Sequence, residues 1–196
     1  MSSQGADLPD RGMIHGRFQP FHRGHLAYAL AAADRCRQLF VGITNPDERS
    51  RSYEPAEPER HLPQNNPFSY TERMLMVLAT MEDCGLRERV NVVPFPVDQP
   101  ALWHAYVLPG TVHYLRVFTP WGDEKAGRLR RAGHRVELID AHQERDVTGT
   151  QVRAALRAGD PAWEALVPDG TARTIRSLTG TPDHQNTSRG DQHGKR

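Results

Sequence analysis

Residues 15–25 read His-Gly-Arg-Phe-Gln-Pro-Phe-His-Arg-Gly-His, and this stretch decides how the fold and the function are interpreted. Two apolar residues precede it and an alanine-rich segment with helical spacing follows it, so we predict a strand, a turn and a helix. His22 and His25 stand three residues apart where the helix begins, and their rings therefore share one face. The unpaired amides of the first helical turn point the same way, which makes this turn a site for an anion such as a polyphosphate.

A strand, a turn and a helix with two surface histidines is the simpler interpretation of this stretch. It accounts less well for the combination of residues, because Gly16, Arg17, Pro20 and Gly24 occur together with both histidines. We therefore interpret the stretch as a functional element.

The composition restricts the classes of protein to which the chain can belong. Its 196 residues suit one domain with its own core, and its formal net charge of +1 provides no basic field for nucleic acid. No stretch is long and apolar enough for a membrane span, and the N-terminus has no apolar signal region. We therefore expect a soluble, cytoplasmic protein that binds neither nucleic acid nor membranes. Its two cysteines, Cys36 and Cys84, are expected to be buried free thiols.

Short apolar segments alternate with helical patterns along the chain, which predicts an α/β fold with a parallel sheet. Ligands of such sheets bind at the carboxyl ends of the strands, near the point where the strand order reverses. The turn at residues 16–25 follows the first expected strand, as this rule requires. The expected strands are 12–16, 39–44, 90–95, 112–118 and 136–139, and the expected helices are 24–36, 69–84, 99–108, 122–132, 149–158 and 161–178.

The pattern also predicts the boundaries of the folded domain. We expect residues 11–178 to form it and residues 1–10, which are small and polar, to be disordered. Residues 46–64 are rich in proline and charge, and we interpret them as a loop insertion that is either a lid or disordered. Residues 179–196 lack apolar spacing and are expected to form a disordered tail.

A second candidate phosphate-binding element lies late in the chain, where residues 146–153 read Asp-Val-Thr-Gly-Thr-Gln-Val-Arg before a helix. Thr148 or Thr150 is expected to cap that helix, and Gly149 to let the backbone approach a ligand. Arg153 lies one turn further on, where its side chain reaches an anion at the start of the helix. A capped helix with a solvated arginine is the alternative. Together with the first motif, this element is interpreted as half of a clamp on one triphosphate.

The two elements supply hydroxyls, amides, imidazoles and arginines but no evident carboxylate base. An attacking group that is already an anion, such as a phosphate monoester, needs no base, and the protein must then only align the reactants and stabilise charge. Mg²⁺ held mainly by the nucleotide phosphates would complete such a site without metal-ligating side chains. This inventory favours nucleotidyl transfer over hydrolysis.

The motifs resemble those of the nucleotidylyltransferase superfamily, over roughly residues 12–176. This resemblance rests on Gly16-Arg17-Phe18-Gln19-Pro20-Phe21-His22-x-Gly24-His25 and Thr148-Gly149-Thr150-x-x-Arg153. Three shorter stretches are similar to the archaeal-type nicotinamide mononucleotide (NMN) adenylyltransferases: Asn66-Pro67-Phe68-x-x-x-Glu72-Arg73, Ala101-Leu102-Trp103 and Trp163-Glu164-x-Leu166-Val167-Pro168. The resemblance implies a Rossmann-like parallel sheet with helices on both faces, of the HIGH-motif type. Relatives are often homo-oligomers, so we expect one here.

The resemblance also implies roles for individual residues. In the family, the arginine and the two histidines of the first motif contact the ATP phosphates, the glycine between the histidines packs near the nucleoside, and the later motif binds the β- and γ-phosphates. This implies catalytic roles for His22, His25, Arg17 and Arg153. The nucleotide-binding residues that it implies are Gly16, Arg17, Phe18, Gln19, Gly24, His25, Thr119, Thr148, Gly149, Thr150 and Arg153.

An acceptor site is implied in the same way. The family tryptophan stacks on the pyridine ring, which implies that role for Trp103, and a cationic ring favours an aromatic face. A core tryptophan on an amphipathic helix is the alternative. Asn66 and Arg73 fall at positions where family members bind the mononucleotide and hold the loop. For Arg73, a structural ion pair near Glu72 is an equally good interpretation. Thr44 and Asn45 begin the loop in which the acceptor is read.

Two departures from the family pattern leave the nucleobase and the acceptor open. Residues 118–123, Phe-Thr-Pro-Trp-Gly-Asp, replace a Ser-x-Asn-Pro-like segment, and the long insertion follows residues 44–46. The first hypothesis is adenylyl transfer from ATP to NMN, giving NAD and pyrophosphate. The second is the same reaction with CTP or another nucleotide and a phosphonate or sugar-phosphate acceptor in specialised metabolism. The third is a non-catalytic nucleotide-binding regulator. A class I aminoacyl-tRNA synthetase fragment is disfavoured by the short, lysine-poor chain.

Overall fold

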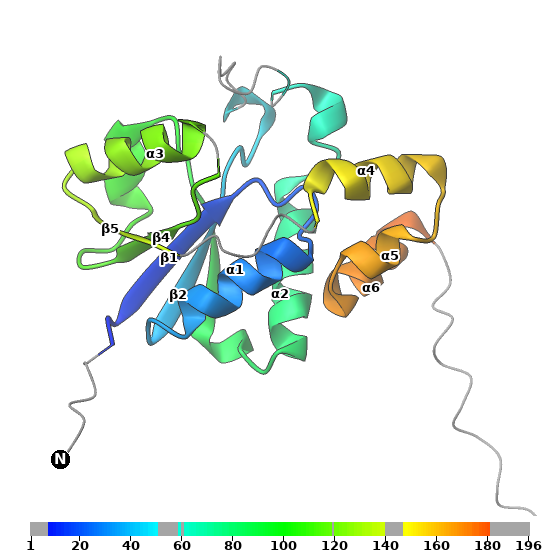
Figure 1. Ribbon diagram of the computed structural model, residues 1–196, viewed down its shortest axis with the longest axis horizontal. Helices are drawn as coiled ribbons and strands as arrows, with labels where there is room; N and C mark the ends of the chain where they lie inside the picture. The colour runs from blue at the N-terminus through cyan, green and yellow to red at the C-terminus, as the bar shows by residue number, and fades with distance from the viewer. Residues whose placement is uncertain (1–7, 51–58, 60, 119, 140–146, 181–196) are drawn as a thin grey trace, which may run out of the picture.

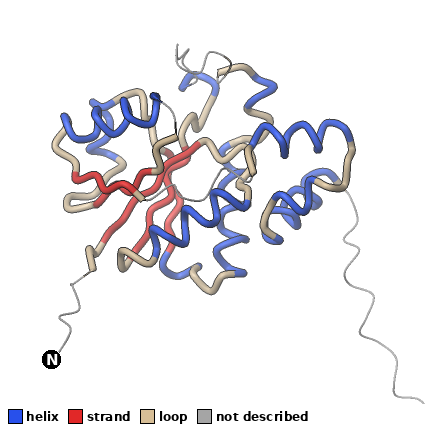
Figure 2. Tube along the Cα trace, in the orientation of Figure 1, coloured by secondary structure: helices blue, strands red, loops and turns tan. Residues whose placement is uncertain are grey.

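Five parallel strands form one sheet in the order β3-β2-β1-β4-β5, which confirms the predicted α/β class. Figure 2 shows the strands side by side with helices around them. The computed structural model describes residues 8–50, 59, 61–118, 120–139 and 147–180. The strands are β1 (Arg11–Gly16), β2 (Gln38–Ile43), β3 (Val90–Pro94), β4 (Val112–Leu115) and β5 (Arg135–Leu138). The fourth strand is shorter than the predicted 112–118. Neither neighbouring strand pairs with residues beyond Leu115. β1 pairs with the fourth strand only through Gly12 and Met13, and β5 ends at Leu138.

Helices follow the strands largely where the sequence predicts them. The α-helices are α1 (Arg23–Ala33), α2 (Tyr70–Asp83), α3 (Pro120–Arg131), α4 (Gly149–Ala158), α5 (Trp163–Leu166) and α6 (Asp169–Thr179). Short 3-10 helices are η1 (Glu48–Ser50), η2 (Pro63–Asn65), η3 (Arg87–Arg89) and η4 (Pro100–Ala105).

Proline explains the main differences between the predicted and the observed helices. The predicted helix 99–108 is only the 3-10 segment η4, which lies between Pro100 and Pro109. The predicted helix 161–178 is two helices, because Val167 before Pro168 is extended and interrupts the turn. The predicted helix 122–132 begins two residues early at Pro120, whose fixed φ suits a first helical position.

Helices cover both faces of the sheet, as expected (Figure 1). Successive strand residues point to opposite faces, so neighbours in β1 contribute to different cores. Ile14 packs with residues of α1 and α2 on one face, whereas Met13 packs with Trp121 and Leu129 of α3 and with Trp103 of η4 on the other.

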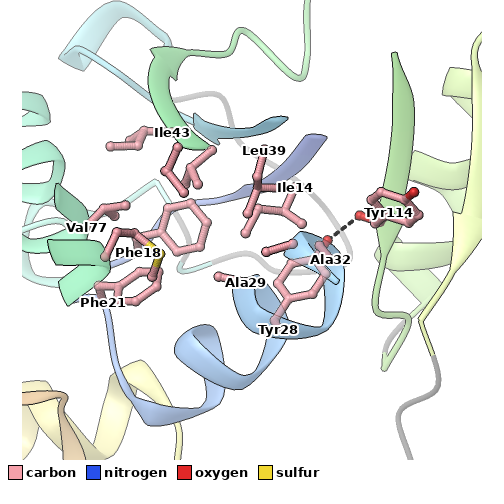
Figure 3. Packing of buried hydrophobic residues seen from close by; sticks show 14 of the residues in the cluster. Ile14, Phe18, Phe21, Tyr28, Ala29, Ala32, Leu39, Ile43, Val77 and Tyr114 are labelled. Carbon is pink, nitrogen blue, oxygen red and sulfur yellow. Dashed lines mark hydrogen bonds between the residues drawn. The ribbon is translucent and has the colours of Figure 1, made fainter. Parts of the chain in front are cut away.

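The core beneath α1 fixes the turn that follows β1 (Figure 3). Phe18 and Phe21 of this turn are fully buried and pack in one cluster with Ile14. Tyr28 of α1 is buried as well, and its hydroxyl donates a hydrogen bond to the backbone carbonyl of Tyr114 in β4. The first motif is therefore held against β1 and β4 together.

The C-terminal helices are anchored through α6, which packs closely on α2. A Cβ atom added to Gly170 would lie 2.5 Å from the backbone of Ala79 and Thr80, so only glycine permits this contact. The hydroxyls of Thr80 and Thr171 are hydrogen-bonded beside it, at 3.1 Å.

Further predictions concern the cysteines, the insertion, the two ends of the chain and membrane spans. Cys36 is a buried free thiol as predicted, but Cys84 is exposed because it caps the end of α2. Of the predicted insertion, the described part contains η1 and η2, and residues 51–58 and 60 lie outside the described residues. Residues 1–7 and 181–196, predicted to be disordered, lie outside them too. None of the described helices is long and apolar enough to cross a membrane.

Two buried histidines lie next to each other in the centre of the sheet. His15 Nε2 is 2.9 Å from His113 Nδ1, and both side chains are almost wholly buried. Burial, with smaller contributions from His134 and Lys125, lowers the pKa of His113 to about 3. Burial also lowers the pKa of His15 well below 6.5. Both rings are therefore neutral at pH 7.

This pair predicts a pH-dependent stability. Below pH 6.5 the unfolded chain binds more protons than the folded protein, so the free energy of unfolding falls as the pH decreases toward 3. A fully shifted histidine contributes up to about 1.4 kcal/mol per pH unit in this window. His113→Gln removes one titrating ring and keeps a hydrogen-bonding group beside His15. Its free energy of unfolding, measured by urea denaturation from about pH 6 to pH 4, should therefore fall less steeply than that of the wild type.

The matched control is His104→Gln, because His104 is exposed. Comparison of the two variants separates an effect of position 113 from the general effect of replacing a histidine by glutamine. Equal slopes for His113→Gln and the wild type would contradict the assignment of His113 as a buried neutral ring.

Candidate functional site

The strand order reverses between β1 and β4, and the candidate site is built around this point. β2 and β3 lie on one side of β1, while β4 and β5 lie on the other. In parallel sheets the loops after such a pair of strands diverge, and ligands bind between them at the carboxyl ends. The first motif follows β1, and Arg116 follows β4 directly.

His22 and His25 stack on each other at the start of α1. Their ring centroids are 3.6 Å apart with an interplanar angle of 25°, and the edge of the His25 ring meets Phe18. Burial lowers the pKa of His25 well below 6.5, the charges of His22, Arg17 and Arg116 lower it further, and a hydrogen bond with the backbone of Pro20 opposes the shift. The backbone N–H of His22 donates to Nδ1 of His25 at 3.3 Å, so the neutral His25 ring carries its proton on Nε2.

Phe18 and Gln19, both predicted to bind the nucleotide, have structural contacts in this conformation. Phe18 is buried with a φ of 51°, and its ring would lie 2.9 Å from a Cβ atom added to Gly16. The Gln19 amide donates to the carbonyl of Phe68 at 2.8 Å and accepts from the Phe68 N–H at 3.0 Å. These side chains hold the turn in place, and their contact with a nucleotide stays a prediction.

The second motif begins α4 and lies against the first. Thr148, rather than Thr150, is the N-cap, and it forms a capping box with Gln151. A Cβ atom added to Gly149 would lie 3.0 Å from the carbonyl oxygen of Gln19 and 2.9 Å from Arg153 Nη1. The small residue therefore allows the two motifs to touch, whereas the sequence suggested close approach of a ligand.

Arg153 joins the motifs through its guanidinium group. Nη1 donates to the Gln19 carbonyl at 2.8 Å, and Nη2 donates to Asn65 Oδ1 at 3.1 Å and to the Thr150 hydroxyl at 3.2 Å. The side chain is only 5% exposed, so the alternative of a solvated arginine is wrong. The two elements of the predicted clamp are together, but three N–H groups of this arginine already have partners in the protein.

Asn65 is a contact of the site that sequence reasoning missed. Its side chain accepts from Arg153, and its backbone carbonyl accepts from Arg17 Nη1 at a longer 3.5 Å. The residue thus links the arginines of both motifs. Its place beside Asn66, in a motif already noted, was the available signal.

Arg73 connects the loops after β1 and β2 with α2. It is 1% exposed and donates hydrogen bonds to the backbone carbonyls of Arg17, Thr44 and Asn45 at 2.8–2.9 Å. A fourth bond, at 3.1 Å, reaches the carbonyl of Ser69. The carboxylate of its neighbour Glu72 belongs to the capping box of α2. The proposed role of Arg73 changes accordingly, from contact with the acceptor to support of the loops.

The remaining predicted acceptor residues lie near this arginine. Thr44 and Asn45 are buried, and Asn45 has a φ of 50°. Among the described residues the buried hydroxyl of Thr44 has no hydrogen-bond partner. Asn66 is also buried, and its amide donates to the carbonyl of Leu62 at 2.9 Å.

Trp103 occupies the core in this structure, which matches the alternative rather than the acceptor role. It is 1% exposed, its indole N–H donates to the carbonyl of Pro96, and its ring packs on Phe95 with centroids 5.7 Å apart. A cavity of about 680 Å³ beside it opens at the amino ends of β4 and β5, away from the two motifs. Stacking of an acceptor ring on Trp103 stays a prediction.

The structure describes residues 118–123, the segment that departs from the family pattern, except for residue 119. Thr119, predicted to bind the nucleotide, lies outside the described residues. Trp121, in the first turn of α3, is buried, and the guanidinium carbon of Arg128 lies 4.8 Å from its ring centroid. Trp121 therefore packs in the core.

Comparisons with known proteins agree with this arrangement. Residues 13–155 match the sequence model of the cytidylyltransferase-like family. The chain is 43% identical to the phosphonoformate cytidylyltransferase of Streptomyces viridochromogenes, over 84% of this chain and 90% of that protein. It is 30% identical to the nicotinamide-nucleotide adenylyltransferase of Pyrococcus abyssi, over 87% of this chain and 84% of that one.

A solved structure supports the fold. The bifunctional NMN adenylyltransferase/ADP ribose pyrophosphatase of Francisella tularensis superposes with a TM-score of 0.61 at 15% identity, covering 88% of this chain. The chain spans half the length of that bifunctional protein. This likeness concerns the Rossmann-like fold alone.

The contacts of Arg73 predict that its loss is costly. Arg73→Met would leave several buried carbonyls without a donor, so we expect the free energy of unfolding to fall by about 3 kcal/mol or more, measured by urea denaturation. Arg73→Lys should lose less, because an ammonium group replaces some of the bonds. Arg131→Met is the control, since Arg131 is 66% exposed in its pair with Glu124, and it should change stability by less than about 0.5 kcal/mol. A similarly small change for Arg73→Met would refute the supporting role.

Proposed function

This chain belongs to the cytidylyltransferase-like family of nucleotidyltransferases, and we propose that it transfers the cytidylyl group of CTP to a small phosphonate acceptor with release of pyrophosphate. The observation that carries the proposal is the 43% identity to a phosphonoformate cytidylyltransferase, which extends over 90% of that protein. The adenylyltransferases are less similar, at 28–30% identity.

The donors of the candidate site suit this reaction. An acid oxygen of the acceptor attacks the α-phosphorus of CTP and forms a new P–O bond. The bond from the α-phosphorus to the bridging oxygen breaks, and pyrophosphate leaves with its electron pair. Because the attacking oxygen is already an anion, no general base is needed, and the protein supplies alignment and charge stabilisation.

Each motif has a proposed role in that alignment. The free amides at the starts of α1 and α4 would bind the triphosphate, with Arg17 and Arg153 beside them. The neutral His25 ring, whose proton lies on Nε2, would donate a hydrogen bond to a phosphoryl oxygen as charge develops there. His22 stacks on it and limits its orientation.

A divalent cation, Mg²⁺, is proposed as a partner of the triphosphate. In the part of the chain that the structure describes, no group of three or more His, Cys, Asp or Glu side chains is arranged to hold a metal ion. Amides, imidazoles and guanidinium groups do not suit a resident Mg²⁺, which prefers carboxylate oxygens and water. The cation would therefore be held by the phosphates themselves.

Adenylyl transfer from ATP to NMN is the second candidate. The motifs around Asn66 and Trp103 and the 30% identity to an adenylyltransferase favour it. The burial of Trp103 weighs against it, because a pyridine ring needs an open aromatic face on which to stack. A small phosphonate needs no such face.

A nucleotide and acceptor panel tests the proposal. We expect purified protein with Mg²⁺ to release pyrophosphate from CTP and phosphonoformate with a kcat/KM at least about 10²-fold above that for ATP and NMN, since each correct contact contributes roughly a factor of ten. The panel includes ATP, GTP, UTP and a sugar phosphate, and pyrophosphate is measured by a coupled assay. Preference for ATP and NMN would replace the proposal by the second candidate. Absence of turnover with every pair would contradict nucleotidyl transfer.

The role of His25 makes a separate prediction. His25→Ala should lower kcat by about 10²-fold while changing the Kd for CTP less than about threefold, because its bond to the substrate strengthens in the transition state. Steady-state kinetics measure kcat, and isothermal titration calorimetry measures the Kd for CTP. His104→Ala, at an exposed position outside the site, is the control and should leave both unchanged. Equal losses in affinity and turnover would exclude a transition-state role for His25.

A further inference from the structure

Arg116 is an arginine of the site that neither motif includes. It follows β4 directly and extends across the reversal point, where Nη1 donates a hydrogen bond to the carbonyl of Gly24 at 3.2 Å. Gly24 lies in the first turn of α1 between the two stacked histidines. The guanidinium carbon stands 5.5 Å from the centroid of the Tyr28 ring, whose hydroxyl is bonded to β4 (Figure 3). The side chain is thus fixed on both sides of the reversal point.

The charge of this guanidinium is not neutralised within the described protein. No described carboxylate forms a salt bridge with Arg116, and its Nε is buried without a hydrogen-bond partner among the described residues. Burial lowers the pKa of Arg116, and Tyr28 opposes this shift, but an arginine remains charged at neutral pH. A half-buried cation of this kind is costly unless an anion accompanies it.

Arg116 lies close to His25, which is proposed to act in the reaction. It is close enough to His25 for its charge to lower the pKa of that ring. Arg153, the arginine that the sequence favoured, is more deeply buried and already bonded to Gln19, Asn65 and Thr150. Among the described residues, the side chain of Arg116 has one hydrogen bond, to Gly24. Its planar guanidinium group keeps further N–H groups, whose geometry matches a phosphoryl or carboxylate group.

We propose that Arg116 is an oxyanion-binding residue of the reaction centre, which contacts a phosphoryl oxygen of the nucleotide or an acid oxygen of the acceptor. The inference rests on the proposed nucleotidyl transfer. Two anions must approach each other in that reaction, and their repulsion is reduced by a cation beside the point of attack. Arg116 provides that cation from the end of β4, next to the first motif.

Steady-state kinetics of Arg116→Gln and Arg116→Lys test the inference, on whichever substrate pair the panel finds most active. Arg116→Gln should lower kcat/KM by at least about 30-fold, and Arg116→Lys should recover part of the loss because it restores the charge without the fork. A rise in KM confined to the nucleotide assigns the contact to its phosphates, and a rise confined to the acceptor assigns it to the acid group there. Values of kcat/KM within about threefold of the wild type for both variants would overturn the inference.

A binding measurement separates this inference from the proposed function. Calorimetry with pyrophosphate and with CTP needs no turnover, so it applies even if every substrate pair fails. The wild type should bind at least one of these ligands about tenfold more tightly than Arg116→Gln. Arg128→Gln is the matched control, because Arg128 also lies over an aromatic ring but belongs to α3, and it should bind both ligands like the wild type. Unchanged affinity and unchanged kcat/KM in Arg116→Gln would refute the role of Arg116, whatever the substrate.

Discussion

The buried guanidinium of Arg73 is the constraint on which the geometry of the site depends. It binds the carbonyls of Arg17, Thr44 and Asn45 and so ties the loops after β1 and β2 to the first turn of α2. Loops at the carboxyl ends of parallel strands have few backbone partners of their own, and one planar group with several donors supplies them here. The histidines at the start of α1 are held at fixed positions because the loop before them is.

The two motifs of the candidate site are joined by a second buried arginine. Arg153 reaches from α4 to the Gln19 carbonyl and to Asn65, and Gly149 allows the close approach that this requires. An arginine whose donors serve the protein has fewer for a ligand. In the proposed reaction, binding of the triphosphate would then depend more on the helix amides and His25, and Arg116 would supply more of the positive charge.

The acceptor side of the site is less like an aromatic pocket than the sequence suggested. Trp103 and Trp121 are both in the core on the α3 face of the sheet. The polar groups near the end of β2 are small, with the Thr44 hydroxyl among them. Such a site would suit the compact, charged acceptor of the proposed reaction better than a flat ring.

The sequence by itself determined the class of the fold, the reaction type and the two motifs, because these depend on local spacing: periodicity, capping residues and glycine positions. It did not determine which arginine serves the ligand. Arg73, Arg116 and Arg153 are the same residue type in similar helical or strand-end contexts, and their roles differ only through the segments that they meet across the fold. Burial of Trp103 was undecided for the same reason. Contacts between residues far apart in the chain carry no local signal, so only the tertiary structure shows which groups these side chains contact.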